Sequence, residues 1–236
     1  MDKIADSTGC QLANLERNYL HLKEFCQAQG IELFGVADIS AIKNDFYISL
    51  AVLEKFDKAV SLGLRLSQSI LEEIADSPTR MYFHHYRTVN AALDQISLKV
   101  ANYIQNKGYA AFPVPASIIL DWQTQKAHLS HKKIGFLAGL GWIGRNNMLV
   151  NKKLGSQFRL ASILTDMPLK IDKPSGDNCA DCHACIPVCP ARAIKDDPAE
   201  FDHIRCYEKL KEFQRQKLAD QYICGVCTKI CKGMKE

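Results

Sequence analysis

Eight of the ten cysteines lie between Cys179 and Cys231, in the last quarter of this 236-residue chain. The first group reads CADCHACIPVCP, which is C-x2-C-x2-C-x3-C-P, and the second is Cys206 followed by CGVCTKIC. Spacings of two residues let thiolates on one loop converge on an iron-sulfur cluster, and the x3-C-P step directs the fourth thiolate toward a second cluster. The tail therefore predicts two [4Fe-4S] clusters in a module of the bacterial ferredoxin type.

The same spacing predicts which cysteines share a cluster. One cluster takes the first three of the run and the other takes the fourth, and the pseudo-symmetry of such modules completes both sets. The predicted sets are Cys179, Cys182, Cys185 and Cys231 for the first cluster, and Cys189, Cys206, Cys224 and Cys227 for the second. Two zinc sites are the alternative, although zinc sites seldom use three cysteines at successive intervals of two followed by x3-C-P.

Composition excludes several other classes of protein. Thirty basic and 26 acidic residues give a net charge of only +4, and no block of like charge suggests a nucleic-acid or membrane surface. The sequence shows no export signal or apolar run long enough to span a bilayer, and its first 178 residues hold only Cys10 and Cys26. We therefore expect a cytoplasmic protein without membrane contact and without a disulfide framework.

Hydrophobic periodicity predicts an α+β protein with two domains. Helical spacing and strand-like runs alternate along the first three quarters of the chain. Helices are expected at 10–29, 89–103 and 127–138, and strands at 31–37, 58–66, from 109, at 147–151 and at 158–164. The segment DMPLKIDKPSGDN then breaks the pattern. We place the boundary there, giving an α/β domain at 1–172 and a cluster domain at 173–236.

The stretch GLGWIGRNN matches G-x-G-x-x-G through Gly139, Gly141 and Gly144. A dinucleotide fingerprint needs a strand before the first glycine and a helix after the last, because the pyrophosphate sits at the helix N-terminus. Here the preceding AHLSHKKIGFLA has helical character and the following NNMLVN has strand character. The order is reversed, so a nicotinamide site is not expected.

Four segments together resemble a known family. AGLGWIGRNNMLV, GSQFRLASILTDMPL, CADCHACIPVCPARAI and CGVCTKIC look like the successive motifs of the epoxyqueuosine reductases, which are cobalamin-dependent, carry a double [4Fe-4S] module and are related to reductive dehalogenases. The resemblance runs from about Tyr82 to Cys231. It implies an N-terminal domain of the nitroreductase and cobalamin-chaperone type that holds a base-off corrinoid close to the first cluster.

In that resemblance the glycine-rich stretch is a corrinoid-contacting loop. Gly139, Gly141 and Gly144 would permit close backbone approach, and its polar side chains would meet the amides or phosphate of the cofactor. Those side chains are Arg145, Asn146 and Asn147. Trp142 is expected either to pack on the cofactor or to anchor the loop in the core.

A histidine-rich segment, FHHYR, precedes the predicted helix at 89–103. Its residues His84, His85 and Tyr86 correspond to a segment near the corrin in the resembled family. A surface or core role is the alternative.

Reduction at a corrinoid requires a proton donor beside the cobalt. Asp121 is our first candidate, since it is the only acid between Asp94 and Asp166. Its alternative role is an N-cap for a segment that starts at Trp122. His128 and His131 stand three residues apart in the predicted helix at 127–138 and are the second candidates, with an ordinary surface or core role as the alternative.

The leading hypothesis is a reductase in which an external low-potential donor, of flavodoxin or ferredoxin type, feeds electrons through the clusters to cobalamin. The substrate would be a small molecule or a modified nucleoside. Family members carry helical repeats after the clusters that help to hold transfer RNA, whereas this sequence ends five residues after Cys231, so tRNA is the less favoured partner. The alternatives are an electron-transfer or cobalamin-handling protein without further substrate, and a reductase that holds FMN.

Overall fold

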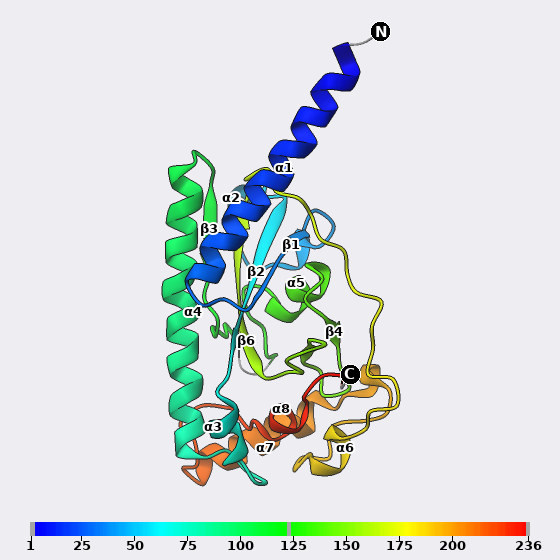
Figure 1. Ribbon diagram of the computed structural model, residues 1–236. Helices are drawn as coiled ribbons and strands as arrows, with labels where there is room; N and C mark the ends of the chain where they lie inside the picture. The colour runs from blue at the N-terminus through cyan, green and yellow to red at the C-terminus, as the bar shows by residue number, and fades with distance from the viewer. Residues whose placement is uncertain (1–2, 122–123, 235–236) are drawn as a thin grey trace. The chain divides into compact units, whose positions relative to one another are not determined.

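Helices and a mixed set of strands make up the protein, which confirms the α+β class (Figure 1). The computed structural model describes residues 3–121 and 124–234, with side chains from residue 12 onward. Four strands form one sheet in the order β1-β2-β6-β3, and β4 and β5 form a separate two-stranded hairpin. No helix in the described ranges is long and apolar enough to cross a membrane.

The chain divides into two compact units that interleave along the sequence. The first unit takes the residues up to Leu64, Ala92–Gly139 and Leu160–Pro174, and the second takes Arg65–Ala91, Leu140–Arg159 and Ser175–Glu236. The glycine-rich stretch from Leu140 onward thus groups with the cysteine-rich segment. The predicted boundary at residue 172, between an α/β domain and a cluster domain, stays a prediction.

The first unit holds the four-stranded sheet and the longer helices. Its elements are α1 (Lys3–Ala28), β1 (Leu33–Asp38), a 3-10 turn at Lys43–Asp45, α2 (Leu50–Leu53), β2 (Lys58–Arg65), most of α4 (Arg80–Asn106), β3 (Ala111–Val114), α5 (His131–Leu137) and most of β6 (Phe158–Thr165). The second unit holds α3 (Gln68–Glu72), β4 (Trp142–Ile143), β5 (Leu149–Val150), α6 (Cys185–Val188), a 3-10 turn at Pro198–Glu200, α7 (His203–Arg215) and α8 (Val226–Ile230).

The sheet has β2 and β6 at its centre and β3 at one edge. β1 pairs antiparallel with β2 in the register Val36↔Val60, and β3 pairs antiparallel with β6 in the register Phe112↔Leu164. Pro113 is tolerated inside β3 because an edge strand can spare one N–H. The strands predicted at 31–37, 58–66 and 158–164, and the one beginning near 109, are confirmed.

Helix α4 starts nine residues before the predicted helix, at Arg80 instead of residue 89. The hydroxyl of Thr79 accepts a hydrogen bond from the Tyr82 amide at 3.0 Å, which satisfies a free N–H of the first turn. The prediction that His84, His85 and Tyr86 precede the helix is therefore wrong. They lie within its first two turns.

Helix α5 is shorter than predicted and starts at His131. The Ser130 hydroxyl caps it by accepting the Lys133 amide at 3.3 Å. His128 lies before the cap, so the prediction that His128 and His131 share one helix is wrong.

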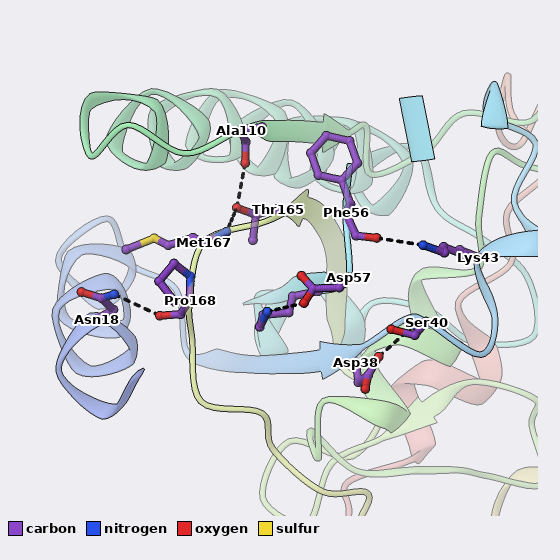
Figure 2. A network of polar contacts seen from close by, with 11 residues as sticks. Asn18, Asp38, Ser40, Lys43, Phe56, Asp57, Ala110, Thr165, Met167 and Pro168 are labelled. Carbon is purple, nitrogen blue, oxygen red and sulfur yellow. Dashed lines mark hydrogen bonds and ion pairs between the residues drawn. The ribbon is translucent and has the colours of Figure 1, made fainter. Parts of the chain in front are cut away.

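The segment that leaves β6 is tied to the first unit by polar contacts (Figure 2). The Thr165 hydroxyl donates to the Ala110 carbonyl at 2.7 Å and accepts the Met167 amide at 3.0 Å, and Asn18 of α1 donates to the Pro168 carbonyl at 3.0 Å. Further along, the Asp172 carboxylate accepts from the Tyr19 hydroxyl at 3.0 Å and from the Val36 amide at 2.9 Å. Asp172 thus joins α1 to β1.

We expect Asp172→Ala to lower the free energy of unfolding of the first unit by about 1–3 kcal/mol, because it leaves the half-buried Tyr19 hydroxyl and the Val36 amide unpaired. Thermal unfolding followed by circular dichroism measures the change. Glu32→Ala removes an exposed carboxylate from the same unit and should leave the midpoint unchanged. Equal midpoints for the two variants would contradict the anchoring role.

Candidate metal centre

The first cysteine run folds as a series of tight turns. Ala180 adopts a left-handed φ of 42°, and the Cys182 amide donates to the Cys179 carbonyl at 2.9 Å. The short helix α6 begins at Cys185, and Cys189 follows its last residue with an extended backbone. In this segment Cys182 is exposed and Cys185 is buried.

The second group of cysteines lies on or beside helices. Cys206 is on α7, Cys224 precedes Gly225, Cys227 is on α8, and Cys231 follows the last residue of α8. Gly225 takes a left-handed φ of 86° at the N-cap of α8, and a Cβ there would come within 2.6 Å of the Tyr82 ring. Helices α6 and α8 contact one another, so the two groups of cysteines meet inside the second unit.

Several of the eight thiols have pKa values that burial and neighbouring thiols raise. Burial raises the pKa of Cys185 to about 11, and the neighbouring thiols of Cys231, Cys179 and Cys182 raise it further. In the same way burial raises the pKa of Cys206 to about 11, and of Cys224 to about 12, with Cys189 a neighbour of both. Burial also raises the pKa of Cys227 well above its usual range, and the thiols of Cys224, Cys206, Cys189 and Cys185 raise it further.

The division of these thiols into two sets of four by the ferredoxin spacing stays a prediction. Within the described ranges no three His, Cys, Asp or Glu side chains stand close enough to hold a single metal ion. In a cubane each thiolate binds a different iron atom, so its ligands need not crowd round one point. Eight thiols in one unit are the number of donors that two [4Fe-4S] clusters require.

Several N–H and O–H groups are aimed at the sulfur atoms. The Trp142 indole N–H donates to the Cys179 Sγ at 3.3 Å, and the Ala193 amide donates to the Cys189 Sγ at 3.4 Å. Burial raises the pKa of Cys231, and hydrogen bonds from the Ser156 hydroxyl, the Gly233 amide and the Ser156 amide act in the opposite direction. Such donors stabilise thiolates, the form that binds iron.

The glycine-rich stretch is a helix end followed by a β-hairpin. Helix α5 precedes it, and β4 pairs antiparallel with β5 in the register Trp142↔Val150. A Cβ on Gly141, whose φ is 155°, would lie 1.9 Å from the Val150 carbonyl oxygen. The glycine is therefore needed for strand approach, and the strand-turn-helix order of a dinucleotide site is not present here, as predicted.

The polar residues of the stretch bind the cysteine-rich segment. The Arg145 guanidinium donates to the carbonyls of Asp196 at 2.8 Å, Cys182 at 3.0 Å and Ala180 at 3.1 Å. Asn147, at a left-handed φ of 58°, lies within 3.4 Å of the His203 ring on α7. Their expected contact with a corrinoid stays a proposal, and the hydrogen bonds they make here position the ligand loop.

Asn146 is buried and works through its neighbour Ser156. Its amide oxygen accepts the Met148 amide at 3.2 Å, which fixes its nitrogen toward the Ser156 Oγ at 3.2 Å. Ser156 in turn lies beside Cys231: its amide donates to the Cys231 carbonyl at 3.3 Å, and its hydroxyl lowers the pKa of the Cys231 thiol against the effect of burial. Sequence reasoning missed Ser156, because nothing in GSQFRL marks it as a neighbour of Cys231.

The candidates on α4 also contact other residues of the second unit. The His85 Nε2 accepts from the Ser67 amide at 2.9 Å, and burial followed by His84 lowers the pKa of His85, so the ring is a neutral acceptor. The Arg159 guanidinium lies over the Tyr86 ring at 4.3 Å. Both side chains are partly exposed and retain surface for a ligand.

The proton-donor candidates lie in the first unit, where the structure links two of them. The backbone of Asp121 pairs with that of Lys126, and the Lys126 ammonium lies 5.0 Å from the centre of the Tyr47 ring. The Nδ1 atom of His128 is 2.8 Å from the Tyr47 carbonyl oxygen, so Tyr47 connects the two candidates. The Asp121 carboxylate accepts the Thr124 hydroxyl at 2.6 Å and so caps a turn. Trp122, which would start the capped segment, lies outside the described residues.

His131 occupies a different place. Its ring lies between the Ser162 hydroxyl and the Pro115 carbonyl, each at 2.9 Å. Because the carbonyl can only accept, the neutral ring carries its proton on Nε2 and accepts from Ser162. Lys132, next to His131, is not one of the predicted proton donors. Burial lowers the pKa of its ammonium to about 8.

Comparison with known structures shows the class of fold. A reductive dehalogenase described in terms of B12-dependent dehalogenation gives a TM-score of 0.72 at 19% identity, covering 93% of this chain and 32% of the dehalogenase. An epoxyqueuosine reductase solved with an epoxyqueuosine-modified tRNA-Tyr stem loop gives a TM-score of 0.60 at 19% identity, covering 93% of this chain and 67% of that one. The fold is the one shared by these reductases.

Sequence comparison shows the relationship more closely. The epoxyqueuosine reductase of Leadbetterella byssophila is 36% identical over 103 residues, 40% of this chain and 33% of the relative. That of Cyclobacterium marinum is 24% identical over 259 residues, 93% of this chain and 80% of the relative. No protein-family model matches. The chain is thus related to the epoxyqueuosine reductases, as its motifs predicted, and spans about a third of the first relative's length.

Arg145→Ala should reduce the iron bound after anaerobic reconstitution by about half, because the Ala180–Cys182 loop loses the hydrogen bonds that hold it. Arg145→Lys should not restore the iron, since one ammonium cannot reach three carbonyls in the fixed geometry of a guanidinium. Arg87→Ala, an exposed arginine of the same unit, is the control and should keep its iron. Full iron content in Arg145→Ala would refute the positioning role.

Proposed function

We propose that this protein is an iron-sulfur, corrinoid-dependent reductase similar to the epoxyqueuosine reductases. The observation that carries the proposal is that eight free thiols belong to the second unit, where α6 and α8 bring the two groups of cysteines together. The relationship to epoxyqueuosine reductases and the fold shared with a B12-dependent dehalogenase support cobalamin as the second cofactor. A reducing compartment, the cytoplasm, suits a protein that depends on free thiols.

The residues present fit the clusters. Each set offers four thiols, and N–H groups of the same unit are directed at sulfur in both sets. Cys179, Cys182, Cys185 and Cys231 would hold the first cluster, and Cys189, Cys206, Cys224 and Cys227 the second. Bound clusters would supply single-electron transfer from an external low-potential donor of the flavodoxin or ferredoxin type.

Fewer residues remain as candidate corrinoid contacts than the sequence suggested, because several of them are buried. Trp142, Asn146 and the glycines Gly141 and Gly144 are buried, whereas Arg145, Asn147, His85 and Tyr86 keep exposed surface. We propose the exposed group, with the backbone around Gly139, as contacts in a corrinoid-binding domain at 1–172 beside a cluster domain at 173–236. Cobalamin would supply low-potential reduction of the substrate there.

The proton would be held by Asp121. Its carboxyl is exposed and fixed by Thr124, so it can exchange protons with solvent while keeping its direction. Hydrogen bonding to Tyr47 raises the pKa of the neighbouring Lys126, with Asp121 a smaller contribution.

The substrate we propose is a small electrophile or a modified nucleoside. The reductase solved with a modified tRNA stem loop favours the nucleoside type, with tRNA itself as a further candidate. The alternative functions are a cobalamin-reducing or electron-transfer protein without a further substrate, and a flavin reductase.

Anaerobic purification and a visible spectrum, before and after incubation with hydroxocobalamin, separate these functions. We expect the broad absorption of clusters together with bands of a bound corrinoid after gel filtration. Flavin bands instead would favour the FMN reductase. A protein that binds no corrinoid after reconstitution would refute the corrinoid proposal.

Cys189→Ala should leave about half of the iron, because it removes a ligand from one set only. Cys26→Ala, a buried cysteine of the first unit, is the matched control and should leave the iron unchanged. No loss of iron in Cys189→Ala would show that the assignment of ligands is wrong.

Asp121→Asn should abolish turnover while leaving cofactor content intact, because the amide cannot deliver a proton. The measurement compares single-turnover substrate reduction with iron and corrinoid content in the same preparation. Unchanged turnover would return Asp121 to the role of a turn cap.

A further inference from the structure

Three exposed lysines lie on adjoining segments beside Cys231. Lys152 and Lys153 are on the turn that follows β5, and Lys232 is on the segment that follows α8. The Met234 amide donates to the Lys152 carbonyl at 3.0 Å, so the two segments run side by side within the second unit. Met234 adds an apolar side chain that is 43% exposed. These three lysines and Met234 are called the lysine surface below.

The fold holds the backbone of the lysine surface against Cys231. Asn151 and Gly155 exchange two backbone hydrogen bonds, at 2.7 and 2.9 Å, which close the turn that carries Lys152 and its neighbour. A Cβ on Gly155 would overlap the Cys231 carbonyl, and one on Gly233 would overlap the Lys152 carbonyl. The turn and the segment after α8 therefore approach as closely as their backbones allow.

The positive charge of the lysine surface is not neutralised locally. The sequence has no Asp or Glu between Asp121 and Asp166, and none between Asp220 and Glu236. Within the described ranges the three ammonium groups form no ion pair, whereas five other lysines each pair with an acid, namely Lys58, Lys133, Lys170, Lys209 and Lys211. The lysine surface thus presents three cations to a partner outside the chain.

A small acidic protein fits the lysine surface better than a nucleic acid does. An uncompensated positive surface attracts and orients an acidic partner. Strong nucleic-acid binding uses about 6–10 phosphate contacts, and no aromatic residue occurs in NKKLG or CKGM to stack on a base. Transient electron-transfer complexes, in contrast, bury less than about 1,200 Å² in total, which a few cations around one apolar side chain can supply.

We propose that the lysine surface is the docking site of the external electron carrier, a small acidic protein. Lys232 directly follows Cys231, so a carrier docked there lies beside a predicted cluster ligand, and an electron tunnels rapidly only over a short distance. One electron leaves the carrier, which is oxidised, and a cluster gains it and is reduced. No bond forms or breaks and no proton moves. The proposal rests on the clusters of the proposed function and not on the corrinoid.

The test measures the rate of cluster reduction by stopped-flow absorption, in protein reconstituted with iron and sulfide. The probe is reduced flavodoxin, an acidic carrier of the proposed kind. We expect the double variant Lys152→Glu with Lys153→Glu to lower the second-order rate constant about tenfold at low salt, because reversed charges repel the carrier. Lys232→Glu should lower it in the same direction. Added salt should reduce both differences, because it screens exposed charges.

Three controls separate docking from other effects. Photoreduced deazariboflavin is uncharged and should reduce the clusters of all variants at the wild-type rate. The double variant Lys152→Arg with Lys153→Arg keeps the charge and should keep the rate with flavodoxin. Lys55→Glu with Lys107→Glu reverses two exposed lysines of the first unit and should also keep it, although the net charge changes equally.

Wild-type rates with flavodoxin in charge-reversed protein of full iron content would overturn the docking site and leave the reductase proposal standing. Slower reduction by deazariboflavin would overturn it too, as would a failure of flavodoxin to reduce the wild-type clusters. If the same variants instead lose affinity for an anticodon stem-loop RNA while the flavodoxin rate is unchanged, the lysines bind nucleic acid. Wild-type protein that does not bind eight iron atoms would refute the clusters themselves, and iron analysis detects that before any kinetic measurement.

Discussion

The hydrogen bonds of Arg145 to the backbone of the cysteine loop are the constraint on which the candidate centre depends. A loop with cysteines at intervals of two has no regular structure of its own, and its carbonyls point outward where the turns leave them. The planar guanidinium of Arg145 donates hydrogen bonds to the carbonyls of Ala180, Cys182 and Asp196. Because a guanidinium is rigid and permanently charged, it fixes the three carbonyls relative to one another before any iron arrives.

The β-hairpin that carries Arg145 can do this because its strands approach so closely. Gly141 leaves no room for a Cβ beside the Val150 carbonyl, and Gly155 leaves none beside the Cys231 carbonyl, where a Cβ would come within 1.9 Å. The first contact closes the hairpin and the second brings it to the end of α8. Gly141 and Gly155 thus allow segments of the second unit to approach one another closely. The motif that resembles a phosphate-binding loop therefore positions thiols here.

Local signals predicted most of the fold. Short apolar runs located β1 and β6, alternating apolar residues located β2, and apolar residues at helical spacing, Leu22 and Cys26 among them, located α1. The errors fell at helix starts. Thr79 and Ser130 each act as a cap by accepting an amide of the next turn, and a serine or threonine forms such a cap only when the chain around it turns correctly. That turn is set by packing. For this reason His85 lies inside α4 although it was predicted before the helix, and His128 lies before α5 although it was predicted inside it.

By itself the sequence determined the number of thiols and their spacing, and it predicts their division into two sets, because ligand convergence on one loop depends on distances along the chain. It also excluded a dinucleotide site, because the order of helix and strand is local. Only the tertiary structure decided what surrounds the thiols. The neighbours Trp142 and Ser156 stand 37 and 75 positions from Cys179 and Cys231 in the sequence, and no local pattern encodes a hydrogen bond across that separation.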